Sequence, residues 1–465
     1  MNRILEVERL QHLLESKKKH DVGRVIGVLP FLSKRTRAIR ENFHSILGEY
    51  IRNICGIKLK RFEVNEEFFT SDNPFIEQII KEVECEDDAA YDLKRFLEQY
   101  LFNQQNEIKP IHPYLFNYVS IVNTNHEREL KKYAHFIKDT LSKDDPHVKL
   151  VFNNKESEDI LAELILSKLD VLEAKKMNVE FQPILDTLAT RYQEDLLFLS
   201  KFKDYFLSSF PILTHFYTFT YVCQLLLKFE QFDEADFSTS TPLYFALEWE
   251  SISKRRKAAD ELEGFKRIKE KSPNLFIHIH TMSQLSHNSL NPDHLTEHPW
   301  RFMHYKEIKD RVNDQGPEHL ERLYQDIKDW IYKYCQWASV EPKEEPQNLS
   351  HAFRILFGCL KEGMSTEVCE KYGGNIEDLG ASVFLKNRGS LGPILNMNHE
   401  MLLLLTAVCV KEKRIPLNQL FEEFLNRGVA FDRYSKKEII ELFDSLNILD
   451  KKSDSGDAQY VKPIL

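Results

Sequence analysis

The sequence predicts a mainly α-helical fold: a multi-helical body followed by a C-terminal winged-helix domain of three helices and a β-hairpin. Gly and Pro together make up about 7% of the 465 residues, against roughly 12% in average proteins, so long elements and few turns are expected. Apolar residues recur at helical spacing over much of the chain, as in Leu5–Leu14, Ile39–Ile54 and Ile160–Leu172. Residues 398–465 change to a mixed pattern of helices and short strands.

The composition is that of a folded, soluble chain. Hydrophobic residues make up 42% and charged residues 29%, which excludes collagen-like, low-complexity and largely disordered proteins. The 32 Phe predict an aromatic-rich core. The seven Cys show no C-x-x-C spacing, so a disulfide framework or thiolate zinc site is not expected. The N-terminal segment MNRILEVERLQHLL lacks the apolar core of a signal peptide, and we expect a cytoplasmic protein.

Polar breaks predict four regions. The clearest break is Val340–Asn348, which combines charge with two prolines. The predicted regions are an N-terminal helical region (1–145, basic over 1–61 and acidic over 62–110), an aromatic-rich helical body (146–340), a helical connector (349–397) and the winged helix (398–465).

One segment, Tyr205–Leu227, is uncharged and long enough to cross a bilayer. It also contains many hydroxyl groups and the polar residues His215 and Gln224, which disfavour insertion. We therefore expect a buried helix, broken near Pro211, and no membrane contact. Further along, Thr241 followed by Pro242 predicts a helix start, because a hydroxyl can cap free N–H groups and proline fits the first helical position.

The winged helix is predicted from caps, periodicity and turn residues that agree with one another. Gly428 stands where a helix C-cap favours positive φ, and Ser435 and Glu438 have the spacing of a capping box. The expected elements are a helix over 398–410, an extended piece over 414–417, helices over 418–428 and 435–447, and strands over 448–450 and 458–462 joined by a turn at 452–456.

Two basic sets are candidate nucleic-acid-binding residues. In the winged helix the third helix would be the recognition helix, and the hairpin would be the wing. Residues 398–465 nevertheless hold 10 basic and 11 acidic side chains, so protein contact by the same fold stays an equal alternative. The candidates here are Arg433, Lys436 and Lys437 at the third helix, and Lys451, Lys452 and Lys462 at the wing.

The second set lies in residues 1–61, which carry 14 basic and 6 acidic residues, whereas residues 62–110 carry 4 and 13. Such a segment can bind phosphates, or it can attract a neighbouring acidic element or subunit, and the sequence favours neither reading. Its candidate phosphate-binding residues are Lys34, Arg35, Arg37 and Arg40.

No catalytic constellation is found, and no cofactor is expected. The segment Gly358–Ser365 has the glycines of a P-loop, but Met364 replaces the essential Lys, so we interpret it as a helix end. A histidine-rich stretch is the one metal-site alternative. In it, His278 and His280 would share one strand face, and His294 and His298 would share one helix face. A polar, partly exposed loop is the favoured interpretation of this stretch, whose histidines are His278, His280, His287, His294, His298 and His304.

The run FLKNRGSLGPILNMNHEMLLLLT (Phe384–Thr406) and the ending KKSDSGDAQYVKPIL (Lys451–Leu465) resemble the DptG (DndG) family, a subunit of the bacterial DNA phosphorothioation-dependent restriction system. The resemblance implies DptF-like and DptH-like partner subunits and an attack on DNA that lacks the phosphorothioate mark. We therefore expect a non-catalytic subunit that assists assembly and engagement of double-stranded DNA in a phage-defence complex. The alternatives are a protein-binding scaffold with no DNA contact and a metal-dependent hydrolase that uses His278–His304.

Overall fold

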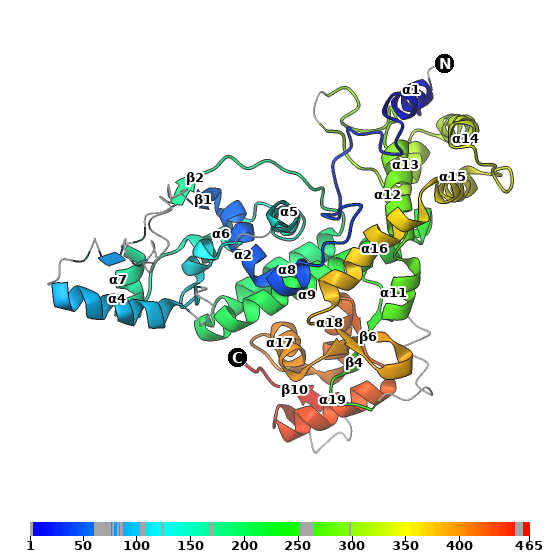
Figure 1. The fold of residues 1–465 in the computed structure, drawn as a ribbon. Helices are drawn as coiled ribbons and strands as arrows, with labels where there is room; N and C mark the ends of the chain where they lie inside the picture. The colour runs from blue at the N-terminus through cyan, green and yellow to red at the C-terminus, as the bar shows by residue number, and fades with distance from the viewer. Residues whose placement is uncertain are drawn as a thin grey trace. The chain divides into compact units, whose positions relative to one another are not determined.

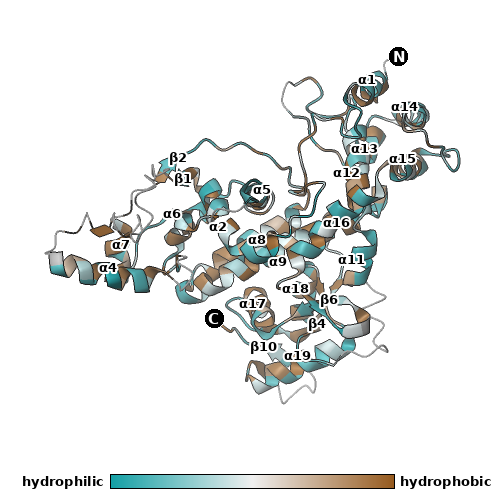
Figure 2. Ribbon diagram, viewed as in Figure 1, coloured by the Kyte–Doolittle hydropathy of each residue, from teal (hydrophilic) through white to brown (hydrophobic). Residues whose placement is uncertain are grey.

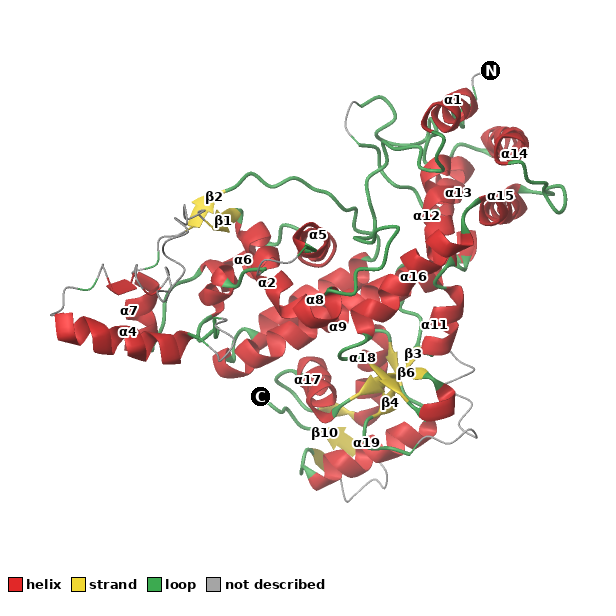
Figure 3. Cartoon of the chain, viewed as in Figure 1, coloured by secondary structure: helices red, strands yellow, loops and turns green. Residues whose placement is uncertain are grey.

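The chain is mainly α-helical, as the sequence predicts (Figure 3). The structure, a computed structural model, describes residues 3–59, 76, 79–80, 83, 87–102, 108–121, 125–167, 169, 172–251, 264–296, 299–451 and 459–465. The chain forms two compact units, each built from segments far apart in the sequence: unit 1 is Met1–Arg40, Glu180–Leu188 and Phe216–Leu465, and unit 2 is Glu41–Val179 and Ala189–His215. The four contiguous regions expected from the sequence remain a prediction.

The described part of unit 2 is helical and contains a small β-ladder, in which β1 (Ile57–Leu59) pairs antiparallel with β2 (Leu172–Ala174). The helices α2, α8 and α9 contribute residues to both units. The helices that supply unit 2 are α2 (Ile39–Cys55), α4 (Asp87–Leu101), η2 (Pro113–Tyr118), α5 (Glu127–Ile137), η3 (Lys138–Ser142), α6 (Pro146–Asn153), α7 (Ile160–Ser167), α8 (Asp186–Leu199) and α9 (Lys203–Phe229); Figure 1 labels the α-helices among them.

A π-helical turn, η3, lies inside unit 2 and is fixed by side chains from other helices. The Gln193 amide donates to the backbone carbonyls of Leu141 (2.8 Å) and Ser142 (3.1 Å). The buried Tyr50 hydroxyl contacts both the Ser142 hydroxyl and the Tyr192 hydroxyl. These bonds matter because a widened turn leaves backbone groups that need other partners.

Unit 1 contains the other described helices, several of which are amphipathic as the periodicity predicts. Figure 2 shows hydrophobic and hydrophilic residues alternating around them. In α14, the buried residues Leu323, Ile327, Trp330 and Tyr334 follow the spacing of one helix face. The helices of this unit are α1 (Val7–Lys17), η4 (Phe232–Glu234), α11 (Phe265–Lys271), α12 (Asn274–Leu285), α13 (Tyr305–Asp314), α14 (Pro317–Ala338), α15 (Leu349–Gly363), α16 (Thr366–Gly380) and η5 (Gly389–Leu391), followed by a C-terminal module described below.

The long apolar helix α9 runs through Pro211 without interruption, so the predicted break is wrong. Proline removes one backbone donor from a helix, and burial along the helix offsets that cost. Among the described residues, α9 is the one helix long and apolar enough to cross a membrane. Within its apolar window 89% is buried inside the structure, which supports the buried-helix interpretation.

The segment after Thr241 forms strands, so the predicted helix start there is also wrong. Strand β3 (Leu243–Tyr244) pairs in parallel with β8 (Val429–Ala430). Strand β4 (Ala246–Leu247) pairs in parallel with β6 (Pro393–Met397), which pairs antiparallel with β5 (Leu385–Asn387). The Gln224 side chain fixes this extended conformation, because it accepts from the Thr241 N–H and donates to the Thr241 carbonyl, both at 2.7 Å.

A buried polar chain joins three elements of unit 1 at His278, which is fully buried on α12. Its Nε2 lies 3.1 Å from the Glu230 carboxylate after α9, and its Nδ1 lies 3.1 Å from the Tyr305 hydroxyl at the start of α13. Asn274 and Lys271 also donate to Glu230, at 2.7 and 3.1 Å. Burial opposes the charge, but bonds from His278, Asn274 and Lys271 outweigh it and lower the pKa of Glu230 to about 2.

This depressed pKa makes Glu230 a source of acid sensitivity. Because its folded pKa lies below its unfolded pKa, its contribution is present above about pH 4.5 and is lost as the pH falls towards 2. We expect E230Q to lower the free energy of unfolding by on the order of 2 kcal/mol at pH 7 and by less at pH 3. All four Trp lie in unit 1, so urea unfolding followed by tryptophan fluorescence reports on this unit.

The matched control for this measurement is E270Q, which removes an exposed carboxylate on α11. We expect it to leave the stability of unit 1 unchanged within about 0.5 kcal/mol. An E230Q effect that stays constant between pH 3 and pH 7 would show that the charge of Glu230 does not contribute.

Candidate nucleic-acid interface

The C-terminal module has the element order that the winged-helix prediction requires (Figure 1, orange to red). Strands β7 (Ile415–Pro416), β10 (Gln459–Val461) and β9 (Leu449–Lys451) form an antiparallel sheet in that order. Gly428, between the second helix and β8, has φ +84°, as predicted for its C-cap position. The module consists of α17 (His399–Val410), β7 (Ile415–Pro416), α18 (Leu417–Asn426), β8, α19 (Arg433–Ser445), β9 (Leu449–Lys451) and β10 (Gln459–Val461).

The N-terminus of α19 is capped by Asp432, which accepts from the N–H groups of Tyr434 and Ser435, both at 2.9 Å. The predicted capping box of Ser435 and Glu438 is therefore wrong. Ser435 lies inside the first turn, is 1% exposed, and donates to the buried Glu250 carboxylate at 3.1 Å. This bond fixes one face of α19 against the segment that follows β4.

Two predicted site residues, Arg433 and Lys436, are exposed and lie on aromatic rings. The Arg433 guanidinium lies 4.6 Å from the Tyr434 ring centre and donates to the Tyr434 hydroxyl at 2.6 Å. The Lys436 ammonium lies 4.8 Å from the Phe421 ring centre. Aromatic rings carry no net charge, so both side chains keep their positive charge while being held near α19. Sequence reasoning did not identify Tyr434 and Phe421 as their supports.

The other predicted cations of the module have carboxylate partners or lie outside the described side chains. Lys437 pairs with Glu441 at 3.5 Å, and Lys462 lies 3.6 Å from Asp450. Lys451 lies in β9, but its side chain is outside the described part of the chain, as is all of Lys452. The structure therefore brings Arg433, Lys436 and Lys437 together at the start of α19.

The charge order along α19 is opposite to the one that stabilises a helix. The helix macrodipole favours acidic side chains at the N-terminus and basic ones at the C-terminus. In α19 the capping Asp432 alone follows this rule: the cations Arg433, Lys436 and Lys437 occupy the first turns, and Glu438, Glu441 and Asp444 come later. Helix stability does not explain this order, whereas an external anion near the first turns would.

The N-terminal candidates divide into two kinds. Arg35 donates to the fully buried Asp378 carboxylate through two N–H groups, at 2.6 and 2.7 Å, and Arg40 donates to the same carboxylate at 2.7 Å. Lys34 and Arg37 are exposed. The geometry of Arg35 and Arg40 thus favours the second reading of the basic segment, attraction to a neighbouring acidic element, in this case α16.

The histidine-rich stretch does not form the predicted strand face, because its first part is the helix α12, whereas its described residues from 286 to 304 form a partly exposed loop, as expected. His278 and His280 lie on α12, and His278 and His287 are fully buried. Burial lowers the pKa of His280, His287 and His304 to about 4. His304 caps α13 and stacks on Phe237 at 3.9 Å, while His294 lies 2.9 Å from Glu6.

A metal site would require several of these ligands to converge. Within the described ranges, which omit His298, no group of three or more His, Cys, Asp or Glu could hold a metal ion. The described histidines are instead distributed among separate packing and capping roles.

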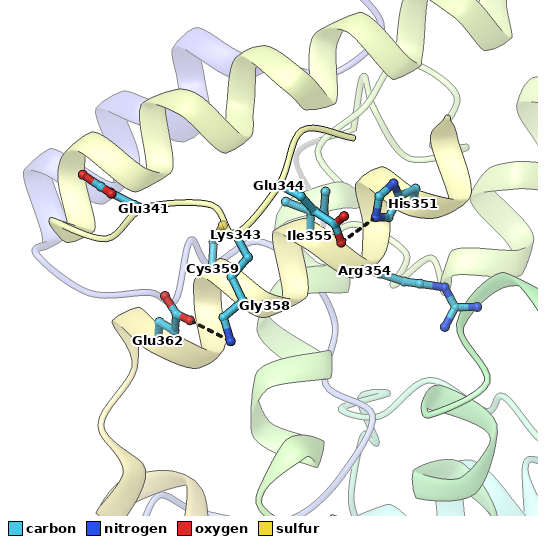
Figure 4. A pocket seen from close by; sticks show the side chains of 9 residues that line it. All are labelled: Glu341, Lys343, Glu344, His351, Arg354, Ile355, Gly358, Cys359 and Glu362. Atoms are coloured by element: carbon cyan, nitrogen blue, oxygen red, sulfur yellow. Dashed lines mark hydrogen bonds and ion pairs between the residues drawn. The ribbon is translucent and has the colours of Figure 1, made fainter. Parts of the chain in front are cut away.

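A cavity of about 200 Å³ lies along α15 beside the loop that precedes it (Figure 4). Four of its polar side chains pair with one another, His351 with Glu344 at 3.1 Å and Lys343 with Glu362 at 3.2 Å, and Arg354 pairs with Glu234 outside the lining. These pairs offset the charges in the lining, so we assign it no ligand. The P-loop-like segment also lies here and is a helix end, as predicted, since α15 stops at Gly363.

Comparison with known proteins gives no relative: the chain matches no family model and no curated protein. The function of the chain is therefore inferred from its geometry and from its sequence resemblance.

The Arg35–Asp378 contact predicts a structural role for this part of the basic segment. Asp378 is fully buried, so D378N leaves two guanidinium groups without their charged acceptor. We expect D378N to lower the free energy of unfolding of unit 1 by about 2–3 kcal/mol, measured by urea unfolding with tryptophan fluorescence. The control E377Q removes a neighbouring, partly exposed carboxylate and should cost under about 1 kcal/mol. Equal costs in the two variants would contradict this role.

Proposed function

We propose that the chain is a non-catalytic subunit of a phosphorothioation-dependent restriction complex, and that its C-terminal module is a winged helix that engages double-stranded DNA. The observation that carries the proposal is the exposed first part of α19, where Arg433 and Lys436 keep their charge on aromatic supports. In winged-helix and related folds, the corresponding helix enters the major groove with its N-terminal residues nearest the bases and phosphates.

The proposed contact is local. Arg433, Lys436 and Lys437 supply positive charge in the first turns of α19, whereas the acidic Glu438, Glu441 and Asp444 follow them along the helix. DNA phosphates would be attracted to the first half and repelled by the second. We therefore propose that α19 meets the duplex with its N-terminal end and contacts few phosphates, so that the chain alone binds DNA weakly.

The resemblance to DptG supports the assembly part of the proposal. Under it, the chain works in the cytoplasm with DptF-like and DptH-like subunits, which supply nucleotide-dependent activity and translocation. Weak DNA binding by the isolated chain suits such a subunit, because linked binding modules gain affinity from one another without new contacts.

A protein-binding scaffold without DNA contact is the second candidate function. It is favoured by the near-equal numbers of basic and acidic residues in the module and by exposed apolar side chains there, including Leu425 (39%) and Leu446 (46%). The two candidates differ in one measurable property: a scaffold shows no salt-dependent affinity for duplex DNA.

The DNA-binding proposal is tested with the double variant R433A/K436A. We expect its affinity for a short fluorescent duplex to fall about tenfold at low salt, and the slope of log affinity against log salt to become shallower by about two. Fluorescence anisotropy at several salt concentrations measures both. The control K19A/K361A removes two exposed cations outside the module and should change neither. Equal losses in both double variants would show that α19 is not the contact.

A further inference from the structure

The cations of the C-terminal module have two kinds of partner, and the difference bears on how the module would meet DNA. Arg433 and Lys436 lie on aromatic rings, and these rings do not offset their positive charge. Lys437, Lys462 and Arg414 face carboxylates: Lys437 pairs with Glu441 and the other two pair with Asp450, while the Arg414 guanidinium also lies 5.5 Å from the Tyr460 ring centre. A carboxylate offsets the charge of the cation and occupies the donors that a phosphate oxygen would need.

The Lys437–Glu441 pair contributes little to the stability of α19. Both side chains are largely exposed, 76% and 60%, and exposed ion pairs are worth about 0.2–1 kcal/mol. The pair also runs in the less favourable direction along the helix, with the basic residue nearer the N-terminus. Little stability is therefore lost when a phosphate takes the place of the Glu441 carboxylate.

Asp450 holds two cations from different segments. Its Oδ2 lies 3.4 Å from the Arg414 guanidinium in the turn before β7, and its Oδ1 lies 3.6 Å from the Lys462 ammonium after β10. The side chains are 38%, 52% and 34% exposed, respectively. One accessible carboxylate thus faces both of these cations at the base of the wing.

We infer that Glu441 and Asp450 compete with DNA phosphates for these cations and so keep the duplex affinity of the isolated chain low. This inference rests on the proposed function and adds its regulation: the DNA-binding face is partly masked by its own carboxylates. A partner group that draws either carboxylate away would strengthen DNA binding without adding a contact to DNA.

Competition between these carboxylates and DNA phosphates would change how duplex affinity depends on salt. DNA affinity falls with salt because bound cations displace counterions from phosphates, with a slope of about 0.9 for each phosphate neutralised. A lysine already paired with a carboxylate contributes less to this slope. Removing the carboxylate charge should therefore raise affinity at low salt and steepen the slope, by about one for E441Q and by one to about two for D450N.

The experiment measures duplex affinity of the full chain at several salt concentrations for E441Q, D450N and the control E422Q. Glu422 is an exposed acidic residue on α18, so E422Q makes the same charge change in the same module away from the paired cations. We expect E441Q and D450N each to bind about two- to fivefold more tightly than the unmodified chain, with steeper slopes. E422Q should change affinity less than about twofold and leave the slope unchanged. Unfolding curves of the variants verify that the fold is retained.

The possible results distinguish failure of this inference from failure of the proposed function on which it rests. If the chain binds duplex DNA and R433A/K436A weakens it, but E441Q and D450N leave affinity and slope unchanged, the inference is wrong and the proposed function stands. Equal tightening by E441Q, D450N and E422Q also overturns the inference, because general charge repulsion then accounts for the effect. If neither the unmodified chain nor any variant binds duplex DNA at low salt, the proposed function is wrong and the inference falls with it.

Discussion

Buried carboxylates hold unit 1 together, and the placement of its segments depends on them. A buried charge is tolerated only when it is paired and hydrogen-bonded, so each of these groups fixes the partners around it. A single carboxylate can accept several bonds, which lets it join segments far apart in the sequence. Five carboxylates of the described residues act in this way, four of them buried and Glu230 partly exposed: Glu230 with His278 and Asn274, Asp233 with Lys309 and Ser350, Glu250 with Ser435, Asp326 with the N–H groups of Ile4 and Leu5, and Asp378 with Arg35 and Arg40.

The sequence predicts the helices and the C-terminal hairpin of this fold better than it predicts which distant residues contact one another. Periodicity along the chain identifies amphipathic helices and the C-terminal hairpin, because both patterns depend on neighbours in sequence. It gives no sign that Asp378 and Arg35 meet, since the two residues belong to segments more than 300 residues apart. The error at Thr241 has the same origin: local capping signals favour a helix, but pairing with Gly428 and Val429 imposes a strand.

The residues of the candidate site also differ in whether the local sequence identifies them. Arg433, Lys436 and Lys437 follow from the position of the third helix, and their placement at its start depends on local sequence alone. Glu441 lies four residues after Lys437, so helical spacing could have identified it as a partner. Asp450 could not be identified in this way, because its two cations come from the turn before β7 and the residue after β10. Only the register of the sheet brings them together.

Burial, rather than net charge, separates the basic residues that build this fold from those that remain available to a partner. The excess of positive charge in residues 1–61 is compatible with phosphate binding and with attraction to an acidic element, and Arg35, which is 26% exposed, is held by a carboxylate with no exposure at all. Lys437 is 76% exposed and is held by a carboxylate that is itself in water. Water weakens the second attraction many-fold relative to the first, so an incoming phosphate can displace Glu441 but cannot displace Asp378. The formal charge of −10 therefore says little about nucleic-acid contact, which depends on the few cations whose partners are exposed or uncharged.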